Sequence, residues 1–362
     1  LEYIISSCSR NLSRLNIIIN YLKQTAVIAR GEDGYVCAGI TPGSLTDILY
    51  ESVITRYNLL NDEMKRLLEQ SSLIGINFDT KKLHDSFQIL RADEELKRIE
   101  GISSLIHEEK DYLYCFENFE TYNIILDKID LNEKQNWNYL LAVYYEKQLS
   151  SPLHYEKKIY NLFKVAFHYK ESLHFDQSIY YYILLIKTEI AVLDCRQAVK
   201  FIEEANNIVT YINERARQLV SAVLTMYEAE CNKLLGQYNK AAVLYQECIS
   251  THKHNHSNLE ILDLILSYAY SLYMDGNLPD ALNIILEIKD ELTVRPSENI
   301  LLYKALSFLS SIYHLQGNDA QAEEYYIGSV TFCKENGFEE EYYIQLKKAS
   351  MIFDTETAQP LV

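Results

Sequence analysis

The sequence predicts an all-α fold in which pairs of helices stack into a solenoid behind a small N-terminal domain. Between Arg215 and Lys334 one pattern recurs three times: an amphipathic helix, a glycine, and a second helix with an alanine five residues after the glycine. The copies are Gly236 with Ala241, Gly276 with Ala281, and Gly317 with Ala322. Glycine supplies the positive φ that ends a helix, and alanine lets two helices cross closely. Recurrence every 40 or 41 residues is typical of a helical solenoid.

This pattern resembles the tetratricopeptide repeat, which places a glycine between its two helices and small or apolar residues at fixed positions around it. In the first helix before Gly276, the family's packing positions hold Ile265, Tyr268, Ala269 and Leu272. The copy with Gly236 departs from the pattern, because Thr225, Glu228 and Asn232 stand where apolar residues are expected. The resemblance implies tetratricopeptide-like helical repeats over residues 151–355.

Composition limits the classes of partner and compartment. The 362 residues carry a net charge of −17, which argues against nucleic acid or an anionic membrane as the main partner. Seven scattered cysteines indicate a reducing, cytoplasmic location. The longest apolar run, Tyr180 to Ile186, is too short to cross a membrane. The chain starts at Leu1 and its opening helix has no preceding cap, so we expect one part of a longer protein.

The N-terminal third mixes helices with short strands. We expect a helix over Leu15–Ala29, a turn over Arg30–Val36 leading into a short strand, and a capping box formed by Ser44 and Asp47 that opens the next helix. Further expected elements are helices over Asp62–Ser72, Asp79–Phe87 and Ala92–Ile106, and a strand over Asp111–Phe116. This succession predicts a winged-helix-like domain over residues 45–150.

The same stretch resembles multi-domain signal-transduction ATPases of the STAND/AAA type, just after their nucleotide-binding core. The resemblance rests on Ser44-Leu45, Leu59 to Leu68 and Ile74 to Asp79. It implies that residues 1–44 are the end of a nucleotide-domain lid and that a winged helix and repeats follow, as in bacterial members. Where that family has histidines, this chain has Asn118 and Asn138, so a phosphate-sensing role does not carry over to Asn118.

Ser150-Ser151-Pro152 is the predicted linker between the winged helix and the repeats. Beyond it we expect a helix over Tyr155–Lys170 that pairs with one over Phe175–Ala191, and another helix that opens at Ala198. Only 20 residues separate Ser178 from the equivalent Ala198, too few for a complete pair of helices. The helix over Phe175–Ala191 is therefore interpreted as shared by two repeat units. A last helix is expected over Glu339–Ile352.

We find no catalytic constellation. The Gly-x-x-x-x-Gly-Lys-Ser/Thr loop that holds phosphates is missing, as are the serine-hydrolase and zinc-protease motifs. This chain is therefore predicted not to be an enzyme and to hold no cofactor, although its parent protein could be an ATPase. His252, His254 and His256 could bind a transition metal, but a polar loop is the favoured interpretation, and no metal site is predicted.

Candidate partner-binding residues come from the tetratricopeptide resemblance, in which first-helix positions build the inner, concave face. Carried over by register, they are Glu230, Lys233, Asp263, Tyr270, Tyr273, Lys304 and His314. Aromatic anchors with charges of both signs suit a protein or peptide ligand. The alternative is that Tyr270 and Tyr273 only pack against the neighbouring pair of helices.

These observations predict the sensor and regulatory half of a signalling ATPase. Its repeats would recognise a protein or peptide ligand and control a missing N-terminal nucleotide-binding domain that oligomerises, in defence or transcriptional signalling. The alternative is a self-contained peptide-responsive regulator of the quorum-sensing type. DNA binding is disfavoured, because the candidate recognition helix Asp79–Phe87 offers only Lys81, Lys82 and His84.

Overall fold

The structure is a computed structural model that describes residues 19, 22–23, 28–31, 34–37, 44–252, 258–293 and 299–352. It divides into two compact units, Leu1–Ser178 and Ile179–Val362. The predicted domain boundaries stay predictions.

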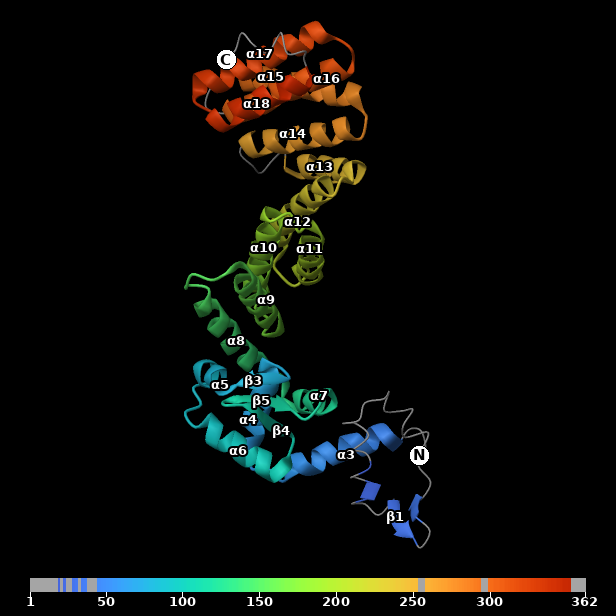
Figure 1. Cartoon of the computed structure of the whole chain (residues 1–362), viewed down its shortest axis with the longest axis vertical. Coiled ribbons are helices and arrows are strands. Elements are labelled where there is room, and N and C mark those ends of the chain that lie inside the picture. Colours follow the sequence, from blue (N-terminus) through green and yellow to red (C-terminus); the bar gives the residue numbers. More distant parts are fainter. Residues whose placement is uncertain are drawn as a thin grey trace. The chain divides into compact units, whose positions relative to one another are not determined.

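The first unit combines helices with two small antiparallel sheets (Figure 1). Its elements are β1 (Ile28–Gly31), β2 (Gly34–Cys37), α3 (Ser44–Asn58), α4 (Asp62–Ile74), β3 (Asn77–Asp79), α5 (Thr80–Phe87), α6 (Ala92–Ser103), β4 (Ile106–Lys110), β5 (Leu113–Phe116), α7 (Phe119–Lys128), α8 (Leu131–Gln148) and α9 (Tyr155–Glu171). β1 pairs with β2, and the other three strands have the order β3-β5-β4. The buried rings of Phe78, Tyr114 and Phe116 pack together from β3 and β5 and anchor this sheet.

Several sequence-based boundaries in this unit are wrong, and two of them change the assignment of an element. The helix predicted to reach Ile106 ends at Ser103, because Ser104 adopts a left-handed conformation with φ 52° and Ile106 begins β4. The helix predicted to reach Ala29 stops earlier, because β1 begins at Ile28. Strand β3 was not predicted; it ends at Asp79, whose carboxylate accepts a hydrogen bond from the Lys82 amide (2.6 Å) and caps α5.

Helices α8 and α9 pack against each other, although the linker was predicted between them. The Tyr169 hydroxyl on α9 donates a hydrogen bond to Glu146 on α8 (2.7 Å). Nδ1 of His168 on α9 lies 2.8 Å from Oδ1 of Asn138 on α8. Ser150 to Pro152 therefore connect two helices that pack against each other.

The second unit is a stack of helical pairs. Its elements are α10 (Phe175–Ala191), which begins just before the division, then α11 (Cys195–Val209), α12 (Glu214–Leu234), α13 (Tyr238–His252), α14 (Asn258–Met274), α15 (Leu278–Thr293), α16 (Asn299–Leu315), α17 (Asp319–Asn336) and α18 (Glu339–Ile352). From α11 onward each helix packs against the next (Figure 1). The predicted all-α, tetratricopeptide-like repeat architecture is confirmed.

The predicted glycine turns close the pairs. Gly276 has φ 90°, and the next amide, that of Asn277, donates to the Leu272 carbonyl (2.9 Å), which is the Schellman arrangement. The turn between α10 and α11 has the same hydrogen bonding, from the Asp194 amide to the Glu189 carbonyl (2.9 Å), but there Leu193 takes the left-handed position with φ 65°. Sequence inspection missed this copy because its glycine is absent.

The alanines five residues after each glycine are fully buried at the crossings of the paired helices, as predicted. Around them lies an apolar interior. Between α14 and α17 it consists of Leu262, Leu266, Ala269, Ala281, Ile285, Ile288, Leu292, Leu301, Ala305, Leu309 and Ile312. Burial of these side chains is the main stabilisation of the stack.

Candidate functional site

A groove opens on the first helices of three consecutive pairs, α12, α14 and α16. We call it the first-helix groove; it has a volume of about 430 Å³. Its lining residues are Glu230, Lys233, Leu234, Tyr238, Asp263, Leu266, Ser267, Tyr270, Lys304 and Phe308. Five of the seven predicted partner-binding residues lie here: Glu230, Lys233, Asp263, Tyr270 and Lys304. Their predicted role in binding stays a prediction.

One wall of this groove is a fixed polar cluster. The Glu230 carboxylate accepts a hydrogen bond from the Tyr245 hydroxyl (2.6 Å) and pairs with the Lys233 ammonium (2.6 Å). Lys233 also lies over the Tyr245 ring, with 5.8 Å from Nζ to the ring centre. Burial, together with the Glu230 charge, raises the pKa of Tyr245, so this hydroxyl stays protonated and remains a donor.

A second wall is aromatic. The rings of Tyr270 on α14 and Phe308 on α16 stack with centroids 5.3 Å apart. Tyr238, at the start of α13, meets Tyr270 edge to face at 6.3 Å. The three rings are half-buried, so each presents a part of its surface to the groove. Half-buried rings offer large contact area at low cost in conformational entropy, which suits binding.

The remaining charges form an exposed pair across two helices. Nζ of Lys304 on α16 lies 3.1 Å from Oδ1 of Asp263 on α14. Both side chains are about half exposed, so a ligand can reach either charge. The two residues stand at the same register, thirteen residues before Gly317 and Gly276 respectively.

Two predicted residues lie outside this groove. Tyr273 packs against the apolar interior between α14 and α17, and its ring touches that of Tyr270 at 6.4 Å. His314 lies near the end of α16, where Nδ1 is 3.3 Å from Oδ1 of Asp319 at the start of α17. Tyr273 thus occupies the packing position that the alternative interpretation gave it, whereas Tyr270 both packs and lines the groove.

Sequence reasoning missed several lining residues, among them Tyr238 and Phe308. Phe308 was within reach, because it stands nine residues before Gly317, at the register that Ser267 has before Gly276. Tyr238 follows the Gly236 turn and belongs to a second helix, so a search restricted to first helices could not find it.

Asn118 and Asn138, which stand where the ATPase family has histidines, both form hydrogen bonds in this structure. The Asn118 side chain accepts a hydrogen bond from the Thr121 amide (2.8 Å) and caps α7. Asn138 is buried and bonds to His168. The missing histidine already argued against a phosphate-sensing role for Asn118, and the cap gives its side-chain oxygen a structural role.

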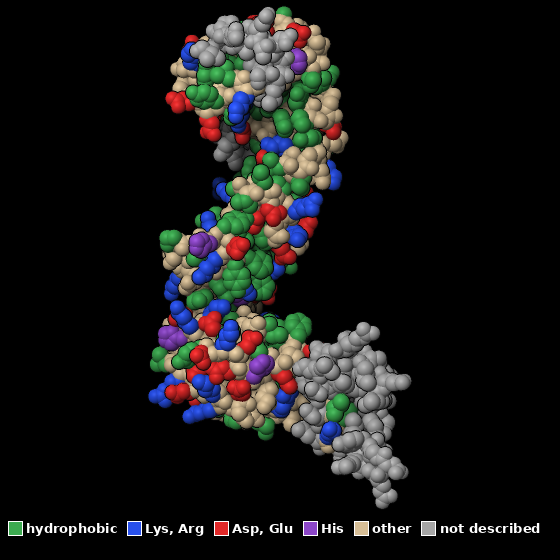
Figure 2. All heavy atoms as spheres, viewed as in Figure 1, with side chains coloured by type: hydrophobic (Ala, Val, Ile, Leu, Met, Phe, Trp, Pro, Cys, Tyr) green, Lys and Arg blue, Asp and Glu red, His purple; other side chains and the backbone are tan. Residues whose placement is uncertain are grey.

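The candidate recognition helix needs revision. α5 is followed by α6, and in a helix-turn-helix pair the second helix enters the DNA groove. The first turn of α6 carries Asp93, Glu94 and Glu95, which would repel phosphates. On the face shown in Figure 2, Lys and Arg side chains are interspersed with Asp and Glu rather than gathered into a stripe.

Within the described ranges, no group of three or more metal-ligating side chains could hold an ion. His254 and His256 lie outside those ranges, so the histidine cluster stays an open prediction. None of the helices that the structure describes has the length and apolar content needed to cross a membrane.

Comparison with known proteins gives structural likeness only. No family model matches the chain, and no curated protein matches it in sequence. Among solved structures, it is similar to the Signal Transduction ATPase with Numerous Domains (STAND) protein with a tetratricopeptide repeat sensor from Pyrococcus horikoshii, at 15% identity and a TM-score of 0.40. That match covers 99% of this chain, which spans 55% of the length of that protein.

Two further similar structures cover most of both chains. Aspartyl phosphate phosphatase F from Bacillus subtilis matches at 13% identity over 90% of this chain and 84% of its own, with a TM-score of 0.48. The Rap conjugation gene regulator of the plasmid pLS20, in complex with the Phr* peptide, matches at 12% identity over 83% of each chain, with a TM-score of 0.42. At these identities and TM-scores, the likenesses support no conclusion about function.

Proposed function

We propose that the first-helix groove binds a peptide or an extended segment of a protein, and that this chain is a ligand sensor. The observation that carries the proposal is the convergence of aromatic and charged residues from three successive first helices on one groove. Asp263 and Lys304 are about half exposed, and the rings of Tyr270 and Phe308 are half-buried, so part of each side chain is open to a ligand. Their gathering at one place therefore calls for a role beyond packing.

The chemistry of the groove fits such a ligand. Tyr238, Tyr270 and Phe308 can hold an apolar side chain, and half-buried aromatic rings dominate the energetics of many protein interfaces. The exposed Lys304–Asp263 pair offers one charge of each sign, which can meet a charged side chain or a peptide terminus and set the orientation of the ligand.

The test starts with selection of binders from a displayed peptide library against the full chain. Affinity is then measured for the wild type and for Tyr270→Ala, with Tyr343→Ala as a matched control, because Tyr343 is an exposed tyrosine on α18. Loss of about 2 kcal/mol, roughly thirty-fold in affinity, is expected for Tyr270→Ala and none for the control. Equal binding by both variants would place the ligand elsewhere.

We further propose that this sensor belongs to a signalling ATPase whose nucleotide-binding domain precedes it; the alternative is a self-contained peptide-responsive regulator. The order α4-β3-α5-α6-β4-β5 and the sheet order β3-β5-β4 support interpretation of this part as a winged helix. An upstream reading frame that encodes a phosphate-binding loop supports the ATPase, and a start codon near Leu1 supports the alternative.

This chain is proposed not to be an enzyme and to need no cofactor. It should neither bind nor hydrolyse ATP, because the phosphate-binding loop is missing from its sequence. Titration calorimetry with Mg-ATP checks this, and micromolar affinity would overturn it. The proposed location is the cytoplasm, where thiols stay reduced; Cys115, Cys195, Cys231, Cys248 and Cys333 are free.

A further inference from the structure

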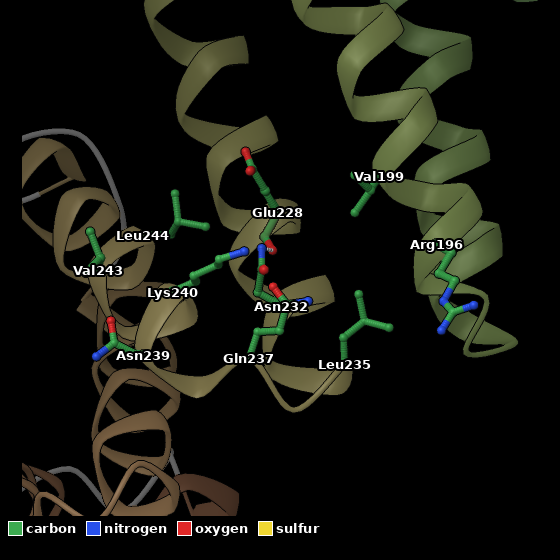
Figure 3. A pocket seen from close by; sticks show the side chains of 10 residues that line it. All are labelled: Arg196, Val199, Glu228, Asn232, Leu235, Gln237, Asn239, Lys240, Val243 and Leu244. Atoms are coloured by element: carbon green, nitrogen blue, oxygen red, sulfur yellow. Dashed lines mark hydrogen bonds between the residues drawn. The ribbon is translucent and has the colours of Figure 1, made fainter.

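A second groove lies among different helices of the same unit (Figure 3). It is bounded by α11, the end of α12 and α13, has a volume of about 570 Å³, and is called the second-helix groove here. Its lining residues are Arg196, Val199, Glu228, Asn232, Leu235, Gln237, Asn239, Lys240, Val243 and Leu244. It shares no lining residue with the first-helix groove.

The cations of the two grooves differ in their surroundings. In the first-helix groove Lys233 and Lys304 are both in ion pairs. In the second-helix groove Arg196 and Lys240 have no ion-pair partner among the described residues, and they lie on opposite sides, on α11 and α13 (Figure 3). The one carboxylate of the lining, on Glu228, points away from Leu235 and Gln237. The lining itself thus carries two unpaired cations and one carboxylate, and a further carboxylate, that of Asp275, accepts a hydrogen bond from Asn239 at its edge (3.4 Å).

The groove also exposes apolar side chains. Val243 on α13 is 60% exposed and Leu235 at the end of α12 is 39% exposed. Leu244 and Val199 continue this apolar surface. The amide of Gln237 stands at the same edge, and a primary amide can both donate to and accept from the backbone of an extended chain. Apolar contact, positive charge and an amide together suit a peptide better than a small anion.

We propose that the second-helix groove binds an acidic segment of a partner protein, in an extended conformation, with apolar side chains between the acidic ones. The apolar side chains contact Val199, Leu235, Val243 and Leu244, and the carboxylates pair with Arg196 and Lys240. Alternate residues of an extended chain point to opposite sides, so acidic and apolar side chains separate as this lining requires. The site is independent of ligand binding in the first-helix groove.

The probe is the synthetic peptide acetyl-Glu-Leu-Glu-Leu-Glu-amide, titrated into the full chain labelled at valine and leucine methyl groups. NMR shifts are expected at Val199, Leu235, Val243 and Leu244 and not at the buried Leu309. The same peptide with lysine in place of each glutamate should cause no shift. Added salt should weaken the binding, because the attraction is between exposed charges.

A second experiment reverses the charges of the two groove cations. Arg196→Glu combined with Lys240→Glu should reduce the affinity about ten-fold or more, and Lys334→Glu on α17, outside both grooves, should leave it unchanged. Circular dichroism verifies that each variant is folded.

No shift at millimolar peptide, equal binding of the lysine peptide, or shifts confined to Leu234 and Leu266 of the first-helix groove would each overturn the proposal. Shifts that depend on protein concentration without peptide would identify a second copy as the occupant, and also overturn it.

Discussion

The α8–α9 pair and the stack from α14 to α17 are both built of antiparallel helices, but their interiors differ. Between α14 and α17 the buried side chains are apolar apart from four serines, which do not titrate, and Ile285 and Leu309 are fully covered. The interior of the α8–α9 pair contains Asn138, Asn161 and His168, all buried. Both interiors contain many apolar side chains, but the α8–α9 pair also buries two amides and an imidazole, which need hydrogen bonds and a neutral charge state.

This difference has energetic consequences. A buried apolar side chain stabilises through the area it removes from water, at any pH. A buried polar side chain stabilises only while its hydrogen bonds are made and its charge state is retained. Nδ1 of His168 has Asn138 as its partner, whereas Nε2 has no hydrogen-bond partner among the described residues. The α8–α9 pair should therefore respond to acid, and the α14–α17 stack should not.

The largest effect is expected from a cavity in the apolar stack. Ile285→Ala removes three carbon atoms from a fully buried position on α15 and should lower the free energy of unfolding by about 3–4 kcal/mol. The control Ile327→Ala, at a position 42% exposed on α17, should cost well under about 1 kcal/mol. Urea denaturation followed by circular dichroism measures both. A cost below about 1 kcal/mol at Ile285 would mean that the stack is loosely packed.

The second prediction concerns pH. Burial, with smaller contributions from the charges of Lys164 and Lys82, lowers the pKa of His168 to about 3. The folded state therefore keeps this imidazole neutral, whereas the unfolded state binds a proton below about pH 6.5. The contribution of His168 to stability should thus be constant above pH 6.5 and should fall by about 1.4 kcal/mol per pH unit between pH 6.5 and the folded pKa of about 3. At pH 4.5 the loss would reach about 2–3 kcal/mol.

Trp137 makes this measurable in the first unit. It is the one tryptophan of the sequence, is buried on α8 and packs against Phe87 on α5, so its fluorescence reports on the first unit during urea denaturation. His168→Gln cannot bind a proton and should have a shallower acid dependence than the wild type. Parallel acid profiles for the two proteins would contradict the role of His168, because carboxylates contribute equally to both.

The α14–α17 stack was also easier to predict from the sequence than the α8–α9 pair. The α14–α17 stack was read from the sequence because glycine and alanine mark its turns and crossings at a fixed spacing. The packing of α8 against α9 was not predicted, because Ser150 to Pro152 have the composition of a linker. An asparagine that is buried, such as Asn138, also cannot be distinguished by residue type from one that is exposed. The first-helix groove was predicted in five of its lining residues because register alone places them. The position of Tyr238 and the existence of the second-helix groove result from contacts between helices, and the periodicity of the sequence does not show such contacts.

The turns allow a finer comparison. Gly276 and Leu193 occupy equivalent left-handed positions, with φ 90° and 65°. Gly276→Ala should lower stability by about 1 kcal/mol, because a side chain disfavours this conformation although space is open around it. Leu193→Gly should raise stability, or leave it unchanged, since Leu193 is 71% exposed and loses little packing. Urea denaturation measures whether the two substitutions change the free energy of unfolding in opposite directions. A marked loss for Leu193→Gly would show that the leucine side chain has a contact that outweighs its strain.

The smallest effect is expected at the exposed pair of the first-helix groove. Lys304 and Asp263 are about half exposed, so water and salt screen their attraction, and holding two long side chains in place costs entropy. A double-mutant cycle with Lys304→Ala and Asp263→Ala should give a coupling of at most about 0.5 kcal/mol, which salt reduces further. If so, the charges contribute little to folding and are free to serve a ligand, because the apolar interior beneath them holds the helices. A coupling above about 1 kcal/mol that persists in high salt would instead make the pair a structural tie between α14 and α16.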